Sequence, residues 1–183
     1  MQFNIFLLAV FTLSGLSFCN AIDLDSIFDE VSTINHDFRD IFRVVSQQVF
    51  RKDDAQPMIE VRKFVDSATE ALNAASDKIG SDSTVDDPAD VVAAFCDDMD
   101  VFTNTQMKTA DILVFKANNM RDAVDGTKVA DSVVRLSSAY DNYSNNMIPL
   151  TENCSPTHVE NIYIVKSTLH RALADLKPKK RPA

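Results

Sequence analysis

The stretch PADVVAAFCDDMDVFTNTQMKTADILVFKANNMRDAV, residues 88–124, decides the fold. Positions three and four residues apart, nearly all of them apolar, run through it without a break: Val92, Phe95, Met99, Phe102, Gln106, Ala110, Leu113, Ala117, Met120 and Val124. Because this spacing places side chains on one face of an α-helix, it predicts a single long helix. We expect Asp87 to cap it, Pro88 to lie in its first turn and Gly126 to end it. The polar stretch 103–106 is where this helix could bend.

Four further segments carry the same helical spacing, at 23–51, 57–79, 129–149 and 155–176. Gly80 and Pro178 are expected to stop the second and the last of these, and Ser155 to cap the last. The alternation of apolar and polar residues that marks β-strands is missing from the sequence. The sequence therefore predicts an all-α protein, an antiparallel bundle of about five helices with short connections.

The N-terminus has the order of a secretory signal peptide. An apolar run, 5–13, is followed by small residues up to Ala21. The run is shorter than the roughly 20 apolar residues that span a bilayer, and no later stretch is apolar enough to do so. We expect cleavage after Ala21, which gives a signal peptide 1–21, a helical bundle domain 22–176 and a basic tail 177–183. The mature protein is expected to be secreted and to have no transmembrane segment.

The cysteines are consistent with secretion through an oxidising compartment. Cys19 leaves with the signal peptide, and Cys96 and Cys154 remain as an even pair. In an oxidising compartment such a pair forms a disulfide by default. The bridge would join the long third helix to the turn before the fifth.

The charge balance excludes one class of partner. The formal net charge is -9, so general electrostatics give the chain no affinity for nucleic acid. The basic tail 177–183 is the exception to this acidity. It is best interpreted as a solvated end, and a contact site for acidic polymers or head groups is the less favoured alternative.

Catalytic and metal-binding patterns are missing from the sequence. The histidines His36, His158 and His170 stand in no ligand spacing, and the last two do not face the same point of one helix. Glycine is too scarce, at 3 residues, to build a backbone cradle for phosphate. We therefore expect no enzyme, no cofactor and no metal.

Two sequons for N-glycosylation occur, Asn142-Tyr143-Ser144 and Asn153-Cys154-Ser155. The second is followed by Pro156 and shares its cysteine with the expected disulfide, which makes it a poor acceptor. Asn142 is the predicted glycosylation site.

The interior of such a bundle has two interpretations. The apolar stripes can pack as a solid core, or they can leave a cavity between the helices. Adaptable methionines such as Met99, Met120 and Met147 suit an irregular cavity. Periodicity alone favours the solid core.

Three segments resemble a known family. They are AFCDDMDVFTNTQ at 94–106, VADSVVRL at 129–136 and MIPLTENC at 147–154. The first resembles the cysteine-bearing helix of fungal hydrophobic surface-binding protein A and the related cell-wall galactomannoproteins. The other two resemble that family's penultimate helix and its turn of hydrophobic residue, proline and cysteine. Members of the family are secreted or wall-associated helical bundles.

This resemblance implies a function. Galactomannoprotein members bind fatty acids, arachidonate among them, in a cavity between helices, so a fatty acid or similar apolar molecule is the implied partner. The residues expected to line the cavity are Phe64, Leu72, Phe95, Met99, Phe102, Leu113, Leu136, Tyr140, Tyr143, Ile162 and Leu169. A tyrosine hydroxyl or Gln106 is expected to hold the carboxylate. The chain departs from common members in its acidity, its lower Ala and Leu content and its basic tail.

Two alternatives stay open at this point. Some family members adsorb to hydrophobic surfaces and recruit a secreted hydrolase there, which requires exposed rather than enclosed apolar side chains. A secreted effector that acts by protein contact is the other alternative. Secreted helical inhibitors of plant cell-wall enzymes carry more cysteines than Cys96 and Cys154, which speaks against that class.

Overall fold

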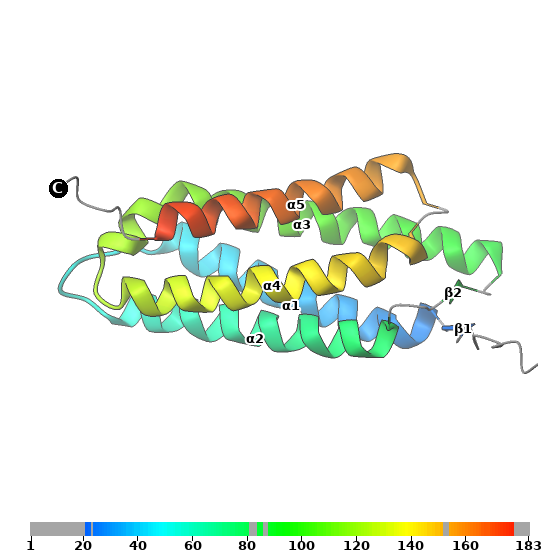
Figure 1. Cartoon of the computed structure of the whole chain (residues 1–183), viewed down its shortest axis with the longest axis horizontal. Coiled ribbons are helices and arrows are strands. Elements are labelled where there is room, and N and C mark those ends of the chain that lie inside the picture. The colour runs from blue at the N-terminus through cyan, green and yellow to red at the C-terminus, as the bar shows by residue number, and fades with distance from the viewer. Residues whose placement is uncertain (1–20, 23, 81–83, 86–87, 152–153, 178–183) are drawn as a thin grey trace, which may run out of the picture.

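The computed structural model describes residues 21–22, 24–80, 84–85, 88–151 and 154–177. Five helices account for nearly all of them and lie side by side along one long axis (Figure 1): α1 Leu24–Gln47, α2 Gln56–Ile79, α3 Ala89–Asp122, α4 Gly126–Leu150 and α5 Pro156–Leu176. The predicted all-α bundle of five helices is confirmed. The predicted signal peptide up to residue 20, the predicted cap at Asp87, the sequon at Asn153 and the tail from 178 lie outside the described residues.

Most predicted helix ends are close to those observed. Gly80, with φ 69°, stops α2, and the Ser155 side chain accepts a hydrogen bond from the Thr157 backbone N–H at the start of α5. The helix α3 is continuous through 103–106, where Thr103 donates its hydroxyl to the Met99 carbonyl within the helix. The helix α1 ends at Gln47, before the predicted residue 51.

The turn between α3 and α4 differs from the prediction. Gly126 begins α4 instead of ending α3, and Asp125 holds the left-handed backbone with φ 60°. A Cβ at Gly126 would lie 2.5 Å from the Arg121 carbonyl oxygen and 2.6 Å from that of Met120. Glycine is therefore required here for close backbone approach.

The helices form a closed ring in the order α1, α2, α4, α5, α3 and back to α1. Successive helices run in opposite directions along the bundle (Figure 1), so the neighbours α1 and α3, α3 and α5, and α2 and α4 are parallel. The helix α2 packs against α1 and α4, although α3 follows it in the chain. Five helices in a ring enclose a common centre to which each contributes a face.

Hydrogen bonds between helices fix their register. The Thr109 hydroxyl of α3 donates to the Phe38 carbonyl of α1 at 2.9 Å, and the Arg121 side chain of α3 donates to the Asp175 carbonyl of α5 at 3.1 Å. Between α2 and α4, the Asn146 amide donates to the Ser76 carbonyl at 3.0 Å. Because each bond joins two parallel helices, it shows which residues of the two helices lie at the same position along the bundle axis.

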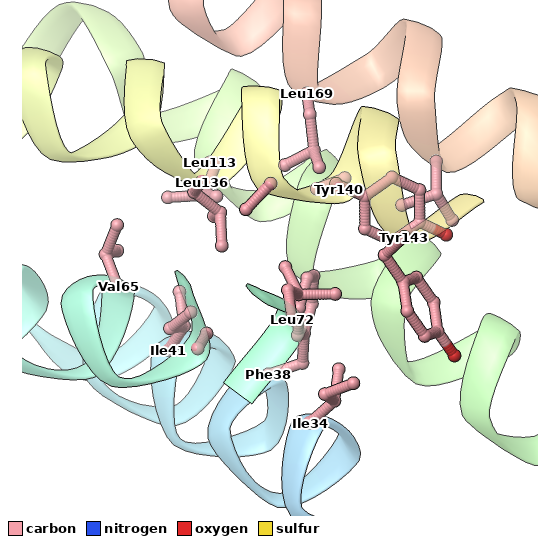
Figure 2. Packing of buried hydrophobic residues seen from close by; sticks show 14 of the residues in the cluster. Ile34, Phe38, Ile41, Val65, Leu72, Leu113, Leu136, Tyr140, Tyr143 and Leu169 are labelled. Carbon is pink, nitrogen blue, oxygen red and sulfur yellow. The ribbon is translucent and has the colours of Figure 1, made fainter. Parts of the chain in front are cut away.

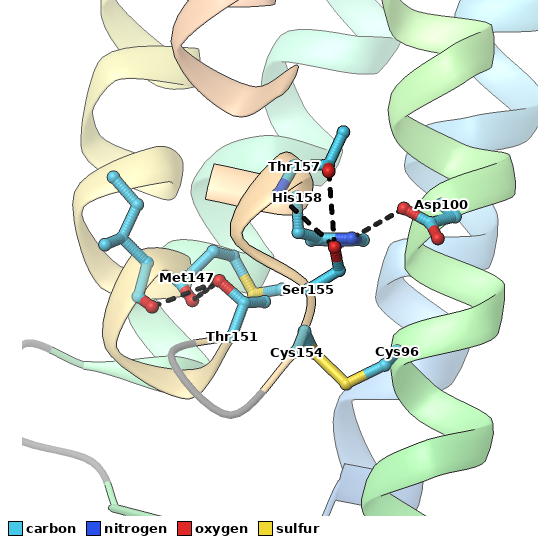
Figure 3. Close-up of a disulfide and its surroundings, with 9 residues drawn as sticks. Cys96, Asp100, Met147, Thr151, Cys154, Ser155, Thr157 and His158 are labelled. Atoms are coloured by element: carbon cyan, nitrogen blue, oxygen red, sulfur yellow. Dashed lines mark hydrogen bonds and ion pairs between the residues drawn. A yellow bond between two sulfur atoms is a disulfide. The ribbon is translucent and has the colours of Figure 1, made fainter. Parts of the chain in front are cut away.

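The predicted disulfide is present and joins α3 to the short segment before α5 (Figure 3). Cys96 and Cys154 have a Cα–Cα distance of 5.4 Å. One turn further along α3, Asp100 lies 2.8 Å from Nδ1 of the buried His158. The bridge and this pair hold the first turns of α3 and α5 together.

A short parallel pairing that the sequence does not predict joins β1 Ala21–Ile22 to β2 Thr84–Val85. Two residues are too few to show an alternating pattern, which is why sequence periodicity misses them. None of the described helices is long and apolar enough to cross a membrane.

Candidate functional site

A polar cluster lies in the centre of the ring. The Tyr140 hydroxyl of α4 donates to Oε1 of Gln106 on α3 at 3.0 Å. Tyr143, one turn along α4, has its ring centroid 6.0 Å from that of Tyr140. All three side chains are buried, with at most 1% of their surface exposed. The family resemblance implies that a tyrosine hydroxyl or Gln106 holds a carboxylate, and in the structure Gln106 and the two tyrosines lie together.

Two polar atoms of this cluster lack a hydrogen-bond partner within the described part of the chain, Nε2 of Gln106 and the Tyr143 hydroxyl. A buried hydroxyl or amide without a partner costs about 1–3 kcal/mol by mutational measures. Since most buried polar groups in native proteins are paired, each of these two calls for an explanation.

Aromatic packing holds the tyrosines in place. Phe38 of α1 packs against Tyr140 with ring centroids 6.2 Å apart. In Figure 2 both tyrosine hydroxyls lie on the side of the rings away from the labelled leucines. Burial raises the pKa of Tyr140 and that of Tyr143 above the ordinary value of a phenol, so both hydroxyls stay protonated in the physiological range.

The other side of the cluster is apolar. Leucines from four helices meet there, namely Leu72, Leu113, Leu136 and Leu169. Fully or nearly fully buried alanines lie among them, at Ala68, Ala75, Ala110, Ala117, Ala139 and Ala172. The centre is thus a packed apolar core with a polar cluster at one end.

The remaining predicted site residues fall into two groups. Phe95, Met99, Phe102 and Ile162 are buried and lie toward the disulfide end of α3 and α5. Phe64 is only half-buried and packs against the outside of the core cluster. The Lys63 ammonium lies 5.6 Å from the centroid of the Phe64 ring. Phe64 also lines a surface pocket together with residues near the end of α1.

Sequence reasoning missed a groove on the surface. It has a volume of 420 Å³ and lies between the first turns of α1 and α3, where Leu24, Phe28 and Phe95 line it. The Phe28 ring, 36% exposed, has its centroid 6.0 Å from that of the buried Phe102. Phe28 lies off the centre of the apolar stripe of α1, so periodicity gave no reason to select it.

Asn142 is exposed on α4, while its sequon neighbours Tyr143 and Ser144 are buried. Its position is compatible with a glycan, and glycosylation there stays a prediction. Among the described residues, no three His, Cys, Asp or Glu side chains are grouped to hold a metal ion.

These features define a class: a disulfide-linked ring of five helices with a polar cluster enclosed in an apolar centre. No family model matches the chain, and no curated protein matches its sequence. Among solved structures, the chain is similar to AFMP4P, in a crystal structure described as a complex with palmitic acid. The TM-score is 0.65 at 16% identity, over 85% of this chain and 100% of that one. This similarity shows a shared fold, and the resemblance to the galactomannoproteins stays a prediction.

Proposed function

We propose that this chain is a secreted lipid-binding protein that holds a long-chain fatty acid or similar molecule inside the ring of helices. The observation that carries the proposal is the pair of unpartnered donors, Gln106 Nε2 and the Tyr143 hydroxyl, buried beside the apolar core. A lipid head group that accepts both hydrogen bonds would remove the cost of burying them. The palmitic acid in the AFMP4P crystal structure, a protein of the same fold, supports this choice of ligand class.

The length of the apolar core beside the polar cluster is comparable with that of a lipid tail. From Gln106 to Met120, α3 rises about 21 Å at 1.5 Å per residue, a length comparable with an extended hexadecanoyl chain. Each buried methylene contributes about 0.8 kcal/mol. A tail that fits between the leucines therefore supplies the affinity, and the polar cluster fixes the direction of the ligand.

We infer binding without catalysis. The histidines buried or paired in the bundle lie apart from the polar cluster, since His158 contacts Asp100 and His170 contacts Asp141 at 3.1 Å. Among the described residues around Gln106 and Tyr143, the available groups are neutral hydrogen-bond donors and acceptors. Such groups orient a ligand and provide no strong nucleophile or base.

Adsorption to hydrophobic surfaces is less well supported. The large apolar side chains that are exposed are distributed over all five helices, from Phe42 on α1 to Phe115 on α3 and Tyr163 on α5. Scattered exposed hydrophobic residues are ordinary on a soluble domain. Passage of the protein through a hydrophobic resin at low salt would argue against surface adsorption, and strong retention would argue for it.

The direct test is a thermal unfolding series with added lipid. The protein is unfolded in guanidinium with its disulfide intact, washed free of lipid and refolded. We expect hexadecanoic acid to raise the Tm progressively, because a ligand at one hundred times its Kd adds about 2.7 kcal/mol of stability. Absence of any shift from dodecanoic to icosanoic acid would refute the proposal.

A matched pair of variants tests the position of the head group. Tyr143→Phe removes the unpartnered hydroxyl and should reduce the ligand-induced shift. Tyr163→Phe makes the same chemical change on the exposed face of α5, where 54% of the side chain is accessible, and should leave the shift as it is. Equal shifts in both variants would place the head group away from Tyr143.

A further inference from the structure

The unpaired groups in the core include an acceptor as well as donors. Oδ1 of Asn35 on α1 is buried and has no partner among the described residues. Asn35 lies two turns after Phe28 on the same face of α1, and Phe28 packs against Phe102 of α3. The side chain of Asn35 therefore belongs to the face of α1 that meets α3.

Helix register places Asn35 at the height of Gln106. The bond between Thr109 and Phe38 joins parallel helices at one height. Asn35 and Gln106 each precede these residues by three positions, so both lie about 4.5 Å back along the axis at 1.5 Å per residue. The seam between α1 and α3 thus holds, at one level, an unpaired acceptor on α1 and an unpaired donor on α3.

Among the described residues, no buried cation lies at the level of Gln106 and Asn35. The buried ionisable side chains in this part of the chain, other than the two tyrosines, are Asp37 and His158. Asp37 accepts a hydrogen bond from the Ser67 hydroxyl of α2 at 3.0 Å. Nδ1 of His158 lies 2.8 Å from Asp100, and its buried Nε2 has no partner among the described residues. Asp100 precedes Gln106 by six residues, which puts His158 about 9 Å away along the axis.

Other charged groups of the neighbouring helices lie nearer the surface, where Arg39 and Lys108 are exposed and several others form ion pairs. On α2 and α4, Arg135 contacts Asp66 at 2.8 Å, and on α4 and α5 Lys166 lies 3.4 Å from Asp141. A carboxylate at Gln106 would therefore be buried without a counter-ion, which carries a large desolvation cost. It would also face the lone pairs of the Asn35 oxygen.

We propose, building on the lipid-binding function, that the site selects lipids whose head group is uncharged and both donates and accepts hydrogen bonds. A hydroxyl accepts from the Gln106 amide and donates its proton to the Asn35 oxygen. A long-chain alcohol and a protonated fatty acid share this chemistry, and an ionised fatty acid lacks the proton to donate. The Tyr143 hydroxyl serves either kind of head group.

The test compares three ligands with the same tail: hexadecan-1-ol, hexadecanoic acid and methyl hexadecanoate, each delivered from cyclodextrin to the refolded full chain. At about pH 8 we expect the alcohol to bind at least tenfold more tightly than the ionised acid and than the methyl ester, which has no proton to donate. At about pH 5, where a larger fraction of the acid is protonated, its affinity should approach that of the alcohol.

The outcomes separate this inference from the proposed function. If the ionised acid binds at pH 8 as tightly as the alcohol, the head-group selectivity is wrong and lipid binding stands. If none of the three binds, the proposed function itself fails. A gain in acid affinity at pH 5 that disappears in His158→Gln would assign the head group to His158 and overturn the inference.

A variant at Asn35 gives a second readout. Asn35→Leu keeps the size of the side chain and removes the acceptor. We expect Asn35→Leu to weaken binding of hexadecan-1-ol. The difference in affinity between hexadecan-1-ol and hexadecanoate at pH 8 should then become smaller or change sign. Tyr163→Phe is the matched control, and thermal unfolding of each variant without ligand reports whether it has folded. An unchanged ratio of affinities in a folded Asn35→Leu would exclude Asn35 from the site.

Discussion

The hydroxyl of Tyr143 differs from that of Tyr140 only in its partner. Both are fully buried on α4, but Tyr140 donates to Gln106 and Tyr143 has no partner among the described residues. A phenylalanine would fill the same space as Tyr143 without burying a polar atom. A group that lowers the stability of the fold and has no structural use is the kind expected at a ligand site.

The two tyrosines therefore predict opposite effects on stability. Tyr143→Phe should raise the free energy of unfolding by about 1 kcal/mol, since it removes a buried hydroxyl without a hydrogen bond. Tyr140→Phe should lower it by about 1–2 kcal/mol, because it leaves the Gln106 oxygen unpaired. Urea unfolding of lipid-free protein measures both. A loss of stability in Tyr143→Phe equal to that in Tyr140→Phe would mean that Tyr143 is held by an ordinary structural bond.

Asp37 gives a pH-dependent prediction. Burial raises the pKa of its carboxyl, and the hydrogen bond from Ser67 opposes this in part. A raised pKa in the folded state means that ionisation destabilises the fold as pH rises above 3.8, the ordinary value of an aspartate. The penalty is complete above the folded pKa and disappears below the unfolded one.

Asp37→Asn removes the charge and can still accept from Ser67. We expect it to increase the free energy of unfolding at pH 7 and to have little effect near pH 3. Urea titrations at the two values measure this difference. The same gain at both would mean that the charge of Asp37 is not the cause.

At the scale of single residues, the sequence predicted the apolar positions better than the polar ones. Leu72, Leu113 and Leu136 repeat with the period of a helix, so their burial followed from the pattern alone. Asn35 is polar and lies outside the apolar stripe of α1, so helical periodicity gave no reason to select it. Its role depends on the register between α1 and α3, which the sequence does not show. Phe64 belongs to the stripe of α2, but it lies near the edge of the bundle, and periodicity does not distinguish an edge from a centre.

At the scale of elements, the turn between α3 and α4 is tightly constrained. Asp125 has a left-handed backbone, and Gly126 approaches two carbonyl oxygens of α3. The sequence located this turn correctly but assigned the glycine to a helix stop, the commonest role of glycine after a helix. The left-handed position falls on Asp125 instead, and close packing explains the glycine.

This turn predicts two substitutions with opposite signs. Gly126→Ala should lower the free energy of unfolding by about 2 kcal/mol, since the new Cβ must displace backbone atoms. Asp125→Gly should be neutral or raise it by up to about 1 kcal/mol, because glycine adopts the left-handed region without strain. Thermal and urea unfolding test both. Tolerance of alanine at 126 without loss would contradict the close approach described here.

The disulfide predicts the largest effect. Cys96 and Cys154 are 58 residues apart in sequence, and closing a loop of this length contributes about 4 kcal/mol in the chain-entropy model. The double variant Cys96→Ser, Cys154→Ser should lose about that much free energy of unfolding. Wild-type protein unfolded with a reductant present is the control and should show the same loss. A loss much below 1 kcal/mol in both would mean that the unfolded chain is already constrained.

At the scale of the whole molecule, processing is the first prediction. Protein collected from the medium of an expressing eukaryotic cell should begin at Ile22. Its mass should exceed the mass calculated for residues 22–183 by that of one glycan. Asn142→Gln should remove the added mass. A chain retained inside the cell with its first residues intact would refute the secretory interpretation.

The arrangement of the helices was beyond the sequence. Each stripe shows that a helix has a buried face, and five stripes predict a bundle. A stripe does not say which other helix covers it. The pairings of α1 with α3 and of α2 with α4 depend on contacts between distant parts of the chain, and the short loops alone suggest neighbours in chain order.

The order of the ring has a consequence for how the protein is made. The helices α1 and α3 emerge early, but one of the two neighbours of α3 is α5, the last helix to be synthesised. Cys96 likewise waits for Cys154, which lies just before α5. The ring therefore closes only when the chain is nearly complete. Until then the apolar faces of α3 and α4 that later contact α5 are exposed to solvent and have to be kept from aggregating. A stop codon before α5 would leave α3 and α4 each without one of its two neighbours in the ring, and we expect the truncated product to be degraded rather than to form a smaller bundle.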